Sequence, residues 1–316
     1  MRTLLLALIS LACVPAAAQT WPTKPIQIIV PFVPGGGTDL LARVVADKLR
    51  DKFGQPVTVE NRSGAAGNIG ADAVYKAAPD GHTLLFTQPA PIVVNKALYG
   101  KLTFEPERFV PIALVSVQDI MLAANPNLPA ANLQELIAYA RANPGKLNFG
   151  SSGAGSAPHL AAELFASMAG VKMVHVPYKG SGESQAATLA GHVDLTFFAF
   201  STALRHTKAG KLRALGVGGA KRNAQAPDVP SISEVLPGYS AASWTALFAP
   251  PDTPAPVVQR LTAATAEIVK MPDVQKRMID AGDESVDMTP AQMAQFLREE
   301  RERWGNLIKA LGLQAQ

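Results

Sequence analysis

The spacing of apolar residues switches repeatedly between a strand pattern and a helix pattern. Residues 26–30 (IQIIV) form a short β-branched run that is typical of a buried strand. Apolar residues at helical spacing then predict a helix over about 38–53, capped by Thr38 and ended by Gly54. Further strands are expected at 57–60 and 83–86, with a helix at 69–78 between them. This order predicts a parallel sheet with helices on both faces.

The same alternation starts again near residue 112 and predicts a second α/β unit. Strands are expected at 112–117, 121–124, 147–150, 172–176, 193–198 and 212–217, and helices at 132–142, 158–169, 182–190 and 201–209. After a strand at 243–249 the chain is predicted to be all helix, at 256–270, 273–281 and 290–311.

This helical tail has no sheet of its own and has to cover one made earlier. We therefore expect a discontinuous first domain, 19–120 plus 243–316, and a second domain, 121–242. Each would be a mainly parallel sheet flanked by helices. Two domains joined by two crossings predict a cleft between them, and the 25 prolines among 316 residues suit rigid loops around it.

Composition limits the possible functions. The chain is 48% hydrophobic and 17% charged, which is typical of a globular protein. Its net charge is only +4, without a Lys/Arg run longer than two residues. A nucleic-acid surface needs a concentrated basic patch, so we expect no nucleic-acid partner.

Residues 1–18 are expected to be a cleavable export signal. Arg2 is followed by an apolar run from Leu4 to Val14 and by the small residues 16–18. The only cysteine, Cys13, lies in this segment, so the mature chain is expected to have no disulfide. Ser10 stands where a lipoprotein signal needs an aliphatic residue, which argues against lipidation. Later apolar stretches are too short to span a membrane.

Two loops place glycines between a strand and a helix. They are PGGGTD (34–39) and SSGAGSAPH (151–159). Each aims backbone N–H groups and a helix N-terminus at the carboxyl end of a strand, which is a favourable place for an anion. One loop lies in each expected domain, so a ligand would be held from both sides. The alternative is that both loops are only tight turns.

Several polar residues near these loops have two interpretations. His159 would either donate to an anion or cap its helix, and Asp39 would either order its loop, meet a ligand amine or favour the helix dipole. In a third loop, VPYKGSGES (176–184), Lys179 would complement a carboxylate or be solvated. Asp194 interrupts an apolar strand and is expected to support a loop, and Trp244 is expected to pack at the return crossing.

Enzyme signatures are missing from the sequence. Leu40 stands where the dinucleotide-binding fingerprint needs its third glycine, and the sequence has no P-loop and no Gly-x-Ser-x-Gly nucleophile motif. The five histidines lack metal-ligand spacing. We therefore expect no covalent chemistry, no metal and no cofactor.

Seven stretches, in this order, closely resemble the substrate-binding proteins of tripartite tricarboxylate transporters, the Bug family. They are WPTKPIQIIVPFVPGGGTDLLAR, VENRSGAAGNIGA, PDGHTLL, NFGSSGAGSAPHLAAELF, VPYKGSGE, AGHVDLTF and GKLRALGV. The resemblance covers nearly the whole chain after residue 20. It implies a periplasmic two-domain Venus-flytrap protein that closes on a small carboxylated molecule. It also implies delivery to a two-component membrane transporter, although many members lack a neighbouring one.

The resemblance assigns roles to the loops. Loops matching 32–39 and 151–159 would hold a carboxylate, partly through ordered water, and residues 178–180 with the region of Asp194 and Phe198 would close the pocket. Gln88, where small polar residues are usual, would affect ligand choice. The predicted ligand-binding set is Phe32, Gly35, Gly36, Gly37, Thr38, Asp39, Gln88, Ser151, Ser152, Gly153, Gly155, Ser156, His159, Tyr178, Lys179, Gly180, Asp194 and Phe198.

The hypothesis is thus a monomeric periplasmic receptor for a small organic acid. A sensory receptor that presents its closed form to a signalling partner is an alternative, and a hydrolase or lyase using His159 or Asp39 is a weaker one. The ligand stays open among mono-, di- and tricarboxylates, acidic amino acids and aromatic acids.

Overall fold

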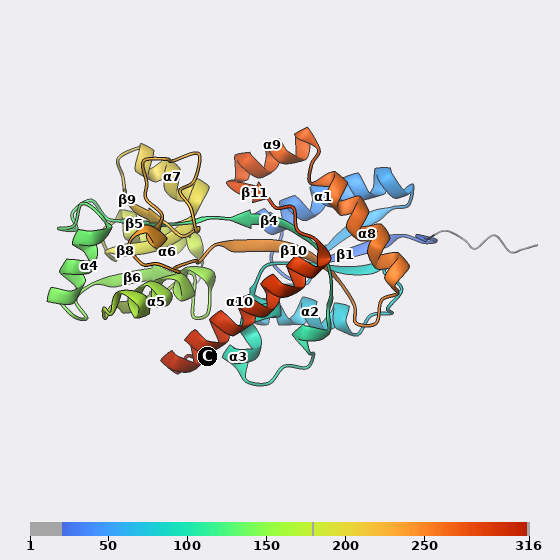
Figure 1. Cartoon of the computed structure of the whole chain (residues 1–316), viewed down its shortest axis with the longest axis horizontal. Helices are drawn as coiled ribbons and strands as arrows, with labels where there is room; N and C mark the ends of the chain where they lie inside the picture. The colour runs from blue at the N-terminus through green and yellow to red at the C-terminus, as the bar shows by residue number, and fades with distance from the viewer. Residues whose placement is uncertain (1–20, 179, 315–316) are drawn as a thin grey trace, which may run out of the picture.

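The computed structural model describes residues 21–178 and 180–314 and consists of two lobes, each built on one sheet (Figure 1). The predicted signal segment, residues 1–18, lies outside the described residues, as does Lys179. The first sheet has the order β11-β4-β10-β3-β1-β2 and the second β7-β6-β8-β5-β9.

The first lobe combines both ends of the chain. Its strands are β1 (Ile26–Val30), β2 (Val57–Asn61), β3 (Thr83–Thr87), β4 (Val110–Gln118), β10 (Ser243–Ala249) and β11 (Asp283–Ser285). Its helices are α1 (Gly37–Phe53), α2 (Asn68–Tyr75), α3 (Asn95–Tyr99), α8 (Ala255–Ile268), α9 (Pro272–Ala281) and α10 (Pro290–Leu311), with the short turns η1 (Ala65–Gly67), η2 (Ala90–Val94, a π-helix) and η3 (Pro106–Arg108).

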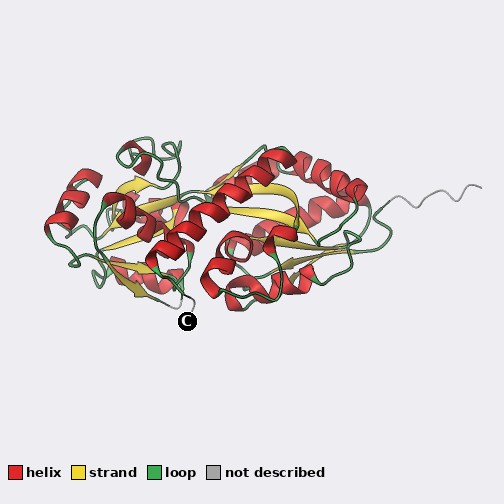
Figure 2. Ribbon diagram, turned by 60° about the horizontal axis from the view of Figure 1, so that its bottom comes forward, coloured by secondary structure: helices red, strands yellow, loops and turns green. Residues whose placement is uncertain are grey.

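The second lobe holds the middle of the chain. Its strands are β5 (Ile120–Ala124), β6 (Asn148–Ser151), β7 (Val174–Pro177), β8 (Leu195–Ala199) and β9 (Arg213–Val217). Its helices are α4 (Leu133–Ala142), α5 (Ala157–Ala169), α6 (Ser181–Leu189), α7 (Phe200–Lys208) and the 3₁₀ turn η4 (Ile232–Glu234). Figure 2 shows helices over both faces of the sheets.

Alternation along the strands explains why both faces are covered. In β1, Ile28 and Val30 pack with α1 and α8, whereas Ile29 joins the opposite core beside α2. In β10, Leu247 and Phe248 divide between the same two cores. Successive strand residues point to opposite faces, so a strand that is apolar on both needs helices on both.

The predicted two-domain α/β class is confirmed, but the sheets are mixed rather than mainly parallel. β1 is parallel to β2 and β3, whereas β10 is antiparallel to β3 and β4. In the second sheet β6 has parallel neighbours and β5 antiparallel ones. β4 leaves the first lobe and β10 returns to it, so the two crossing strands have to run in opposite directions.

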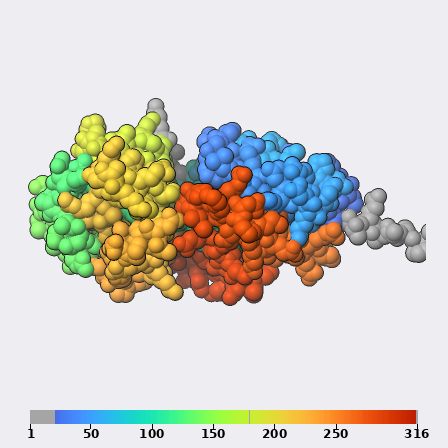
Figure 3. All heavy atoms as spheres, turned by 90° about the horizontal axis from the view of Figure 1, so that it is seen from above, coloured from blue at the N-terminus to red at the C-terminus, as the bar shows by residue number. Residues whose placement is uncertain are grey.

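Only Asp119 separates β4 from β5, so the chain passes from one sheet to the other within three residues. It returns between Val217 and Ser243. These switches agree with crossings near 120 and 243, whereas the exact domain limits stay a prediction. Figure 3 shows a groove between the two lobes on the face seen from above.

Three details of the sequence prediction were wrong. Gly36, not Thr38, is the N-cap of α1, and Thr38 is buried in its first turn. The short helical stretch η2–α3 was not foreseen. The tail after residue 250 contains a strand, β11, which pairs antiparallel with β4.

Candidate functional site

A cavity of about 430 Å³ lies between the two lobes, where strands of both sheets end. Its lining includes Phe32 just after β1, Gln88 just after β3, Ser152 just after β6 and Phe198 near the end of strand β8. Ligands of open α/β sheets bind at the carboxyl ends of strands, so this is the expected place for a site. The predicted residues that line it are Phe32, Gln88, Ser152, Gly155, Ser156 and Phe198.

The second lobe contributes the glycine loop before α5. Ser156 is the N-cap of α5, and its Oγ donates to the carbonyl of Gly153 at 2.7 Å. Pro158 lies in the first turn and lines the cavity with Ala157. The first N–H groups of a helix have no acceptor within it and carry partial positive charge. The start of α5 can therefore stabilise a negative group inside the cavity.

His159 holds the glycine loop through a hydrogen bond on the side away from the cavity lining. It is 3% exposed, and its Nδ1 accepts a hydrogen bond from the Gly155 N–H at 2.9 Å. Its ring stacks on His175, with ring centroids 3.9 Å apart. Burial, followed by the charge of His159, lowers the pKa of His175 to about 4. His159 does not line the cavity, so the structure places it as a support for Gly155.

Buried Ser151 and half-buried Gly153 also stabilise the loop. Ser151 Oγ lies 2.6 Å from His175 Nε2 and accepts from the Gly153 N–H at 3.1 Å. Tyr178 donates its N–H to the Ser151 carbonyl at 3.0 Å. Ser151, Gly153, Tyr178 and Gly180 are not in the cavity lining, whereas Ser181 is.

The first glycine loop behaves differently from the prediction. Gly35 has a φ of +83°, and its N–H donates to Asp39 Oδ2 at 2.9 Å. Asp39 is buried and also accepts from Arg43 and Asn61. Burial alone would raise the pKa of Asp39, but these bonds hold it below its usual value. The carboxylate therefore closes its own loop.

The glycines of this loop do not reach the cavity. Gly35, Gly36 and Gly37 are exposed, and only Phe32 of the predicted segment 32–39 is in the lining. The facing side is instead the segment after β3, from Gln88 to Leu98. Leu98 there contacts Gly155 of the opposite lobe. Sequence reasoning named only Gln88, although the prolines 89 and 91 after a strand were a usable signal for a loop at the site.

Asp194 lies at the far end of the second sheet. Its Oδ2 accepts from the Asn148 N–H at 2.9 Å, and its own N–H donates to Asn148 Oδ1 at 2.9 Å. These residues flank the starts of β6 and β8, whereas Phe198 is near the end of β8. Asp194 therefore has a structural role, as expected, but it joins the starts of two strands rather than supporting a loop. It does not line the cavity, because the length of the strand separates it from the cavity.

Residues of the two crossings and of α10 complete the lining. They include Gln118, Ile120, Ala241, Ser243 and Trp304, none of which was predicted. Helix α10 begins more than 200 residues after the end of β3. No local sequence pattern could therefore reveal that Trp304 lies in the cleft beside the segment that follows β3.

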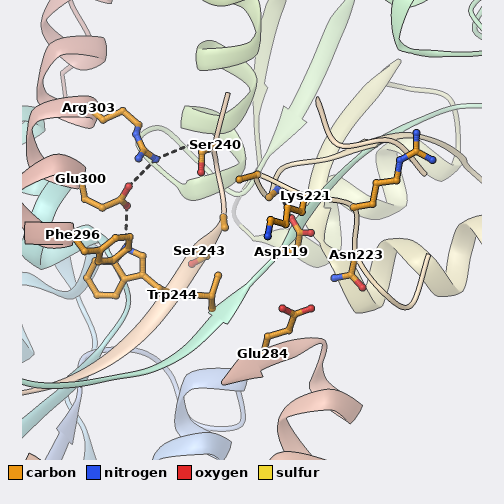
Figure 4. A pocket seen from close by; sticks show the side chains of 15 residues that line it. Asp119, Lys221, Asn223, Ser240, Ser243, Trp244, Glu284, Phe296, Glu300 and Arg303 are labelled. Carbon is orange, nitrogen blue, oxygen red and sulfur yellow. Dashed lines mark hydrogen bonds and ion pairs between the residues drawn. The ribbon is translucent and has the colours of Figure 1, made fainter. Parts of the chain in front are cut away.

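Figure 4 shows a second cavity, of about 340 Å³, behind the crossings. There Glu300, 2% exposed, accepts from the indoles of Trp244 and Trp304, each at 3.1 Å. It also pairs with Arg303 at 2.8 Å, and Arg303 donates to the Ser240 carbonyl. This network ties α10 to the returning strand, in agreement with the packing role expected for Trp244.

Two carboxyl groups beside this second cavity have unusual titration. Burial raises the pKa of Asp119 to about 6, although it accepts from the N–H groups of Gly219 and Ile120. Burial likewise raises the pKa of Asp283 to about 6, against the donation from Gln118 Nε2 at 3.0 Å. Both carboxyl groups are already hydrogen-bonded to residues next to the crossings, namely Gln118, Ile120 and Gly219. The cavity between the lobes is therefore the better candidate for a ligand.

Within residues 21–178 and 180–314, no three His, Cys, Asp or Glu side chains gather as a metal site. The helices of the described chain are too short or too polar to cross a bilayer.

Comparison with known proteins gives the family. Residues 41–313 match the family model of the tripartite tricarboxylate transporter family receptor, TctC. Among curated relatives, a UPF0065 protein from the tcbD-tcbE intergenic region of Pseudomonas sp. strain P51 is 37% identical, covering 94% of this chain and 89% of its own. Protein BugT of Bordetella pertussis is 37% identical, covering 94% and 92%.

Solved structures give the same answer. Rpa4515 of R. palustris, determined with adipate, has a TM-score of 0.80 and 34% identity, covering 93% of this chain and 99% of its own. MatC from Rhodopseudomonas palustris, with bound malate, has a TM-score of 0.77 and 33% identity, covering 91% and 100%. The chain therefore belongs to the TctC, or Bug, family of periplasmic solute receptors.

Proposed function

We propose that this chain captures a small carboxylated solute in the cavity between its two lobes and presents it to a membrane transporter of the tripartite tricarboxylate type. The observation that carries the proposal is the lining of that cavity. The start of α5, with Ser152 and Ser156, comes from one lobe, and Gln88 comes from the other. A bound carboxylate would therefore link the two lobes.

Neutral donors are sufficient for this task. A charge-assisted hydrogen bond contributes roughly 1.5–3 kcal/mol, and micromolar affinity needs only about 8 kcal/mol. The hydroxyl of Ser152, the Gln88 amide and first-turn N–H groups of α5 would supply several such bonds, and Ser156 would add one when its hydroxyl turns from the Gly153 carbonyl to the ligand. Because only a closed arrangement brings both lobes to the ligand, binding would shift the protein toward closure.

The relatives support the ligand class and the location. Two of the similar structures are described with adipate and with malate, which are both carboxylates. The N-terminal segment 1–18 has the pattern of an export signal, which fits a periplasmic receptor. Ser151, Gly153 and His159 would act as positioning residues for the loop, and Asp39 would do so for the loop 33–37.

The experiment is a thermal-shift screen of the mature chain against organic acids, followed by calorimetry on the acids that raise the melting temperature. We expect at least one acid to bind. The double variant Ser152→Ala/Ser156→Ala should weaken it about tenfold or more, through lost charge-assisted bonds. Ser167→Ala, on the exposed side of the same helix, is the matched control and should bind normally.

The proposal fails if no acid binds or if the double variant keeps full affinity. The acid should also be recovered unchanged by NMR after long incubation. Conversion of the acid would favour the hydrolase or lyase alternative instead.

A further inference from the structure

The inference concerns which organic acids fit, and it rests on the proposed function. The described residues that line the cavity include no Asp, Glu, Lys, Arg or His. Their polar side chains are Gln88, Gln118 and four serines, at 152, 156, 181 and 243. The other described side chains of the lining are carbon, apart from the indole nitrogen of Trp304.

The carbon surface comes from a defined group of elements. Val94 of η2, Leu98 of α3 and Trp304 of α10 supply it from the first lobe, and Leu160 of α5 supplies it from the second. The two lobes meet there, because Leu98 contacts Gly155, just before α5. Helix α10 packs against both η2 and α3. These side chains therefore share one region of the cavity.

The polar atom of Trp304 is not available to a ligand. Its Nε1 donates to Glu300 at 3.1 Å, so the indole offers the cavity only ring carbon. Gln118 is partly engaged, since one N–H of its Nε2 donates to Asp283 and only the other could reach a ligand. The donors for a ligand thus come mainly from Gln88, Ser152 and the start of α5, where the Ser156 hydroxyl donates to the Gly153 carbonyl until a ligand replaces that acceptor.

We infer that the solute is an acid with a hydrocarbon body, aliphatic or aromatic, whose carboxylate meets Ser152, Ser156 and Gln88 while its carbon skeleton lies against Val94, Leu98, Leu160 and Trp304. Hydroxyl groups or an additional charge on the carbon skeleton of an acid would lose their hydrating water in this apolar region. They would contact only carbon atoms instead of hydrogen-bonding groups. Burying a polar group without a partner is unfavourable, so polyhydroxy acids and citrate-like acids are rejected.

Two pairs of six-carbon acids test this by calorimetry on the mature chain. Hexanoate and gluconate have one carboxylate each, and adipate and galactarate have two each. Within a pair the length and carboxylates are the same, and only the hydroxyl groups of the body differ. The unsubstituted acid of at least one pair should bind about tenfold more tightly or better than its hydroxylated partner.

A matched pair of variants locates the effect. Val94→Thr keeps the shape but adds a hydroxyl to the lining, and it should weaken the unsubstituted acid about three- to tenfold. Val93→Thr makes the same change in the neighbouring core residue, which is not in the lining, and should leave the affinity ratio unchanged. Thermal unfolding verifies that both variants fold.

Each result has a distinct meaning. Equal or tighter binding of gluconate or galactarate, or a tight complex with citrate alone, overturns the inference but keeps the carboxylate receptor. An unchanged affinity ratio in Val94→Thr also overturns it. If no acid of any kind binds, the proposed function itself falls.

Discussion

Two glycines with the same backbone angle have very different surroundings. Gly145 and Gly155 both have a φ of +75°. A Cβ at Gly145 would meet nothing within 4 Å, whereas a Cβ at Gly155 would overlap the side chain of Leu98 in the other lobe. Leu98 is 4% exposed, so it cannot move aside without disturbing the lining.

Gly155→Ala should therefore weaken ligand binding about tenfold, because closure would have to displace Leu98. Gly145→Ala is the control, since both variants have the same left-handed strain, roughly 1–2 kcal/mol. Calorimetry on the ligand and denaturant unfolding separate the two effects. Equal ligand affinities in the two variants would show that the Leu98 contact is irrelevant to binding.

The sequence was informative about residues next to strand ends and less so about polar residues chosen for their chemistry. Ser152, Ser156 and Gln88 were predicted and line the cavity. Asp39 and His159 instead accept the N–H of a glycine four positions earlier, at Gly35 and Gly155. That shared spacing was visible in the sequence and indicates loop closure rather than ligand binding.

At the scale of elements, apolar periodicity located most of the strands and helices, and the exceptions have physical reasons. β11 has only the polar residues Asp283, Glu284 and Ser285, and it forms because β4 offers a free edge. The helical stretch 90–99 was not predicted because Pro89 stands just before it and Pro91 within it. Both elements matter for function, since 90–98 lines the cleft and β11 supports Gln118.

β11 also makes stability depend on pH. The pKa of Asp283 is raised to about 6 in the fold, against the ordinary value of 3.8. The native state thus holds this proton more tightly, so its contribution to the free energy of unfolding is full below about pH 4 and is lost as the pH rises through 6. Asp119 has the same direction of shift at the neighbouring crossing.

Asp283→Asn should remove part of this dependence. Asn can still accept from Gln118, and at pH 7 we expect it to raise the free energy of unfolding by about 1–3 kcal/mol. The gain should disappear near pH 4. Urea unfolding at both pH values measures it, with exposed Asp287→Asn as the control. A variant whose stability follows that of the wild type across this range would refute the role of Asp283.

At the scale of the whole molecule, the two crossings of the chain between the lobes determine where the cavity forms. Asp119 alone separates the strands of the two sheets, and α10 holds the returning strand through Glu300. The order of elements predicted two lobes and a cleft between them. It could not predict that Trp304, Leu98 and Ser243, far apart along the chain, would meet in one cavity.

The central claim is that a carboxylate is held between the lobes by the start of α5 and by Gln88. A crystal structure of the mature chain with its tightest organic acid tests this most directly. We predict a carboxylate within about 2.7–3.1 Å of donors from Ser152 or Ser156 on one side and Gln88 on the other. An acid bound in the second cavity, beside Asp119, or on the outer surface of either lobe would contradict the account.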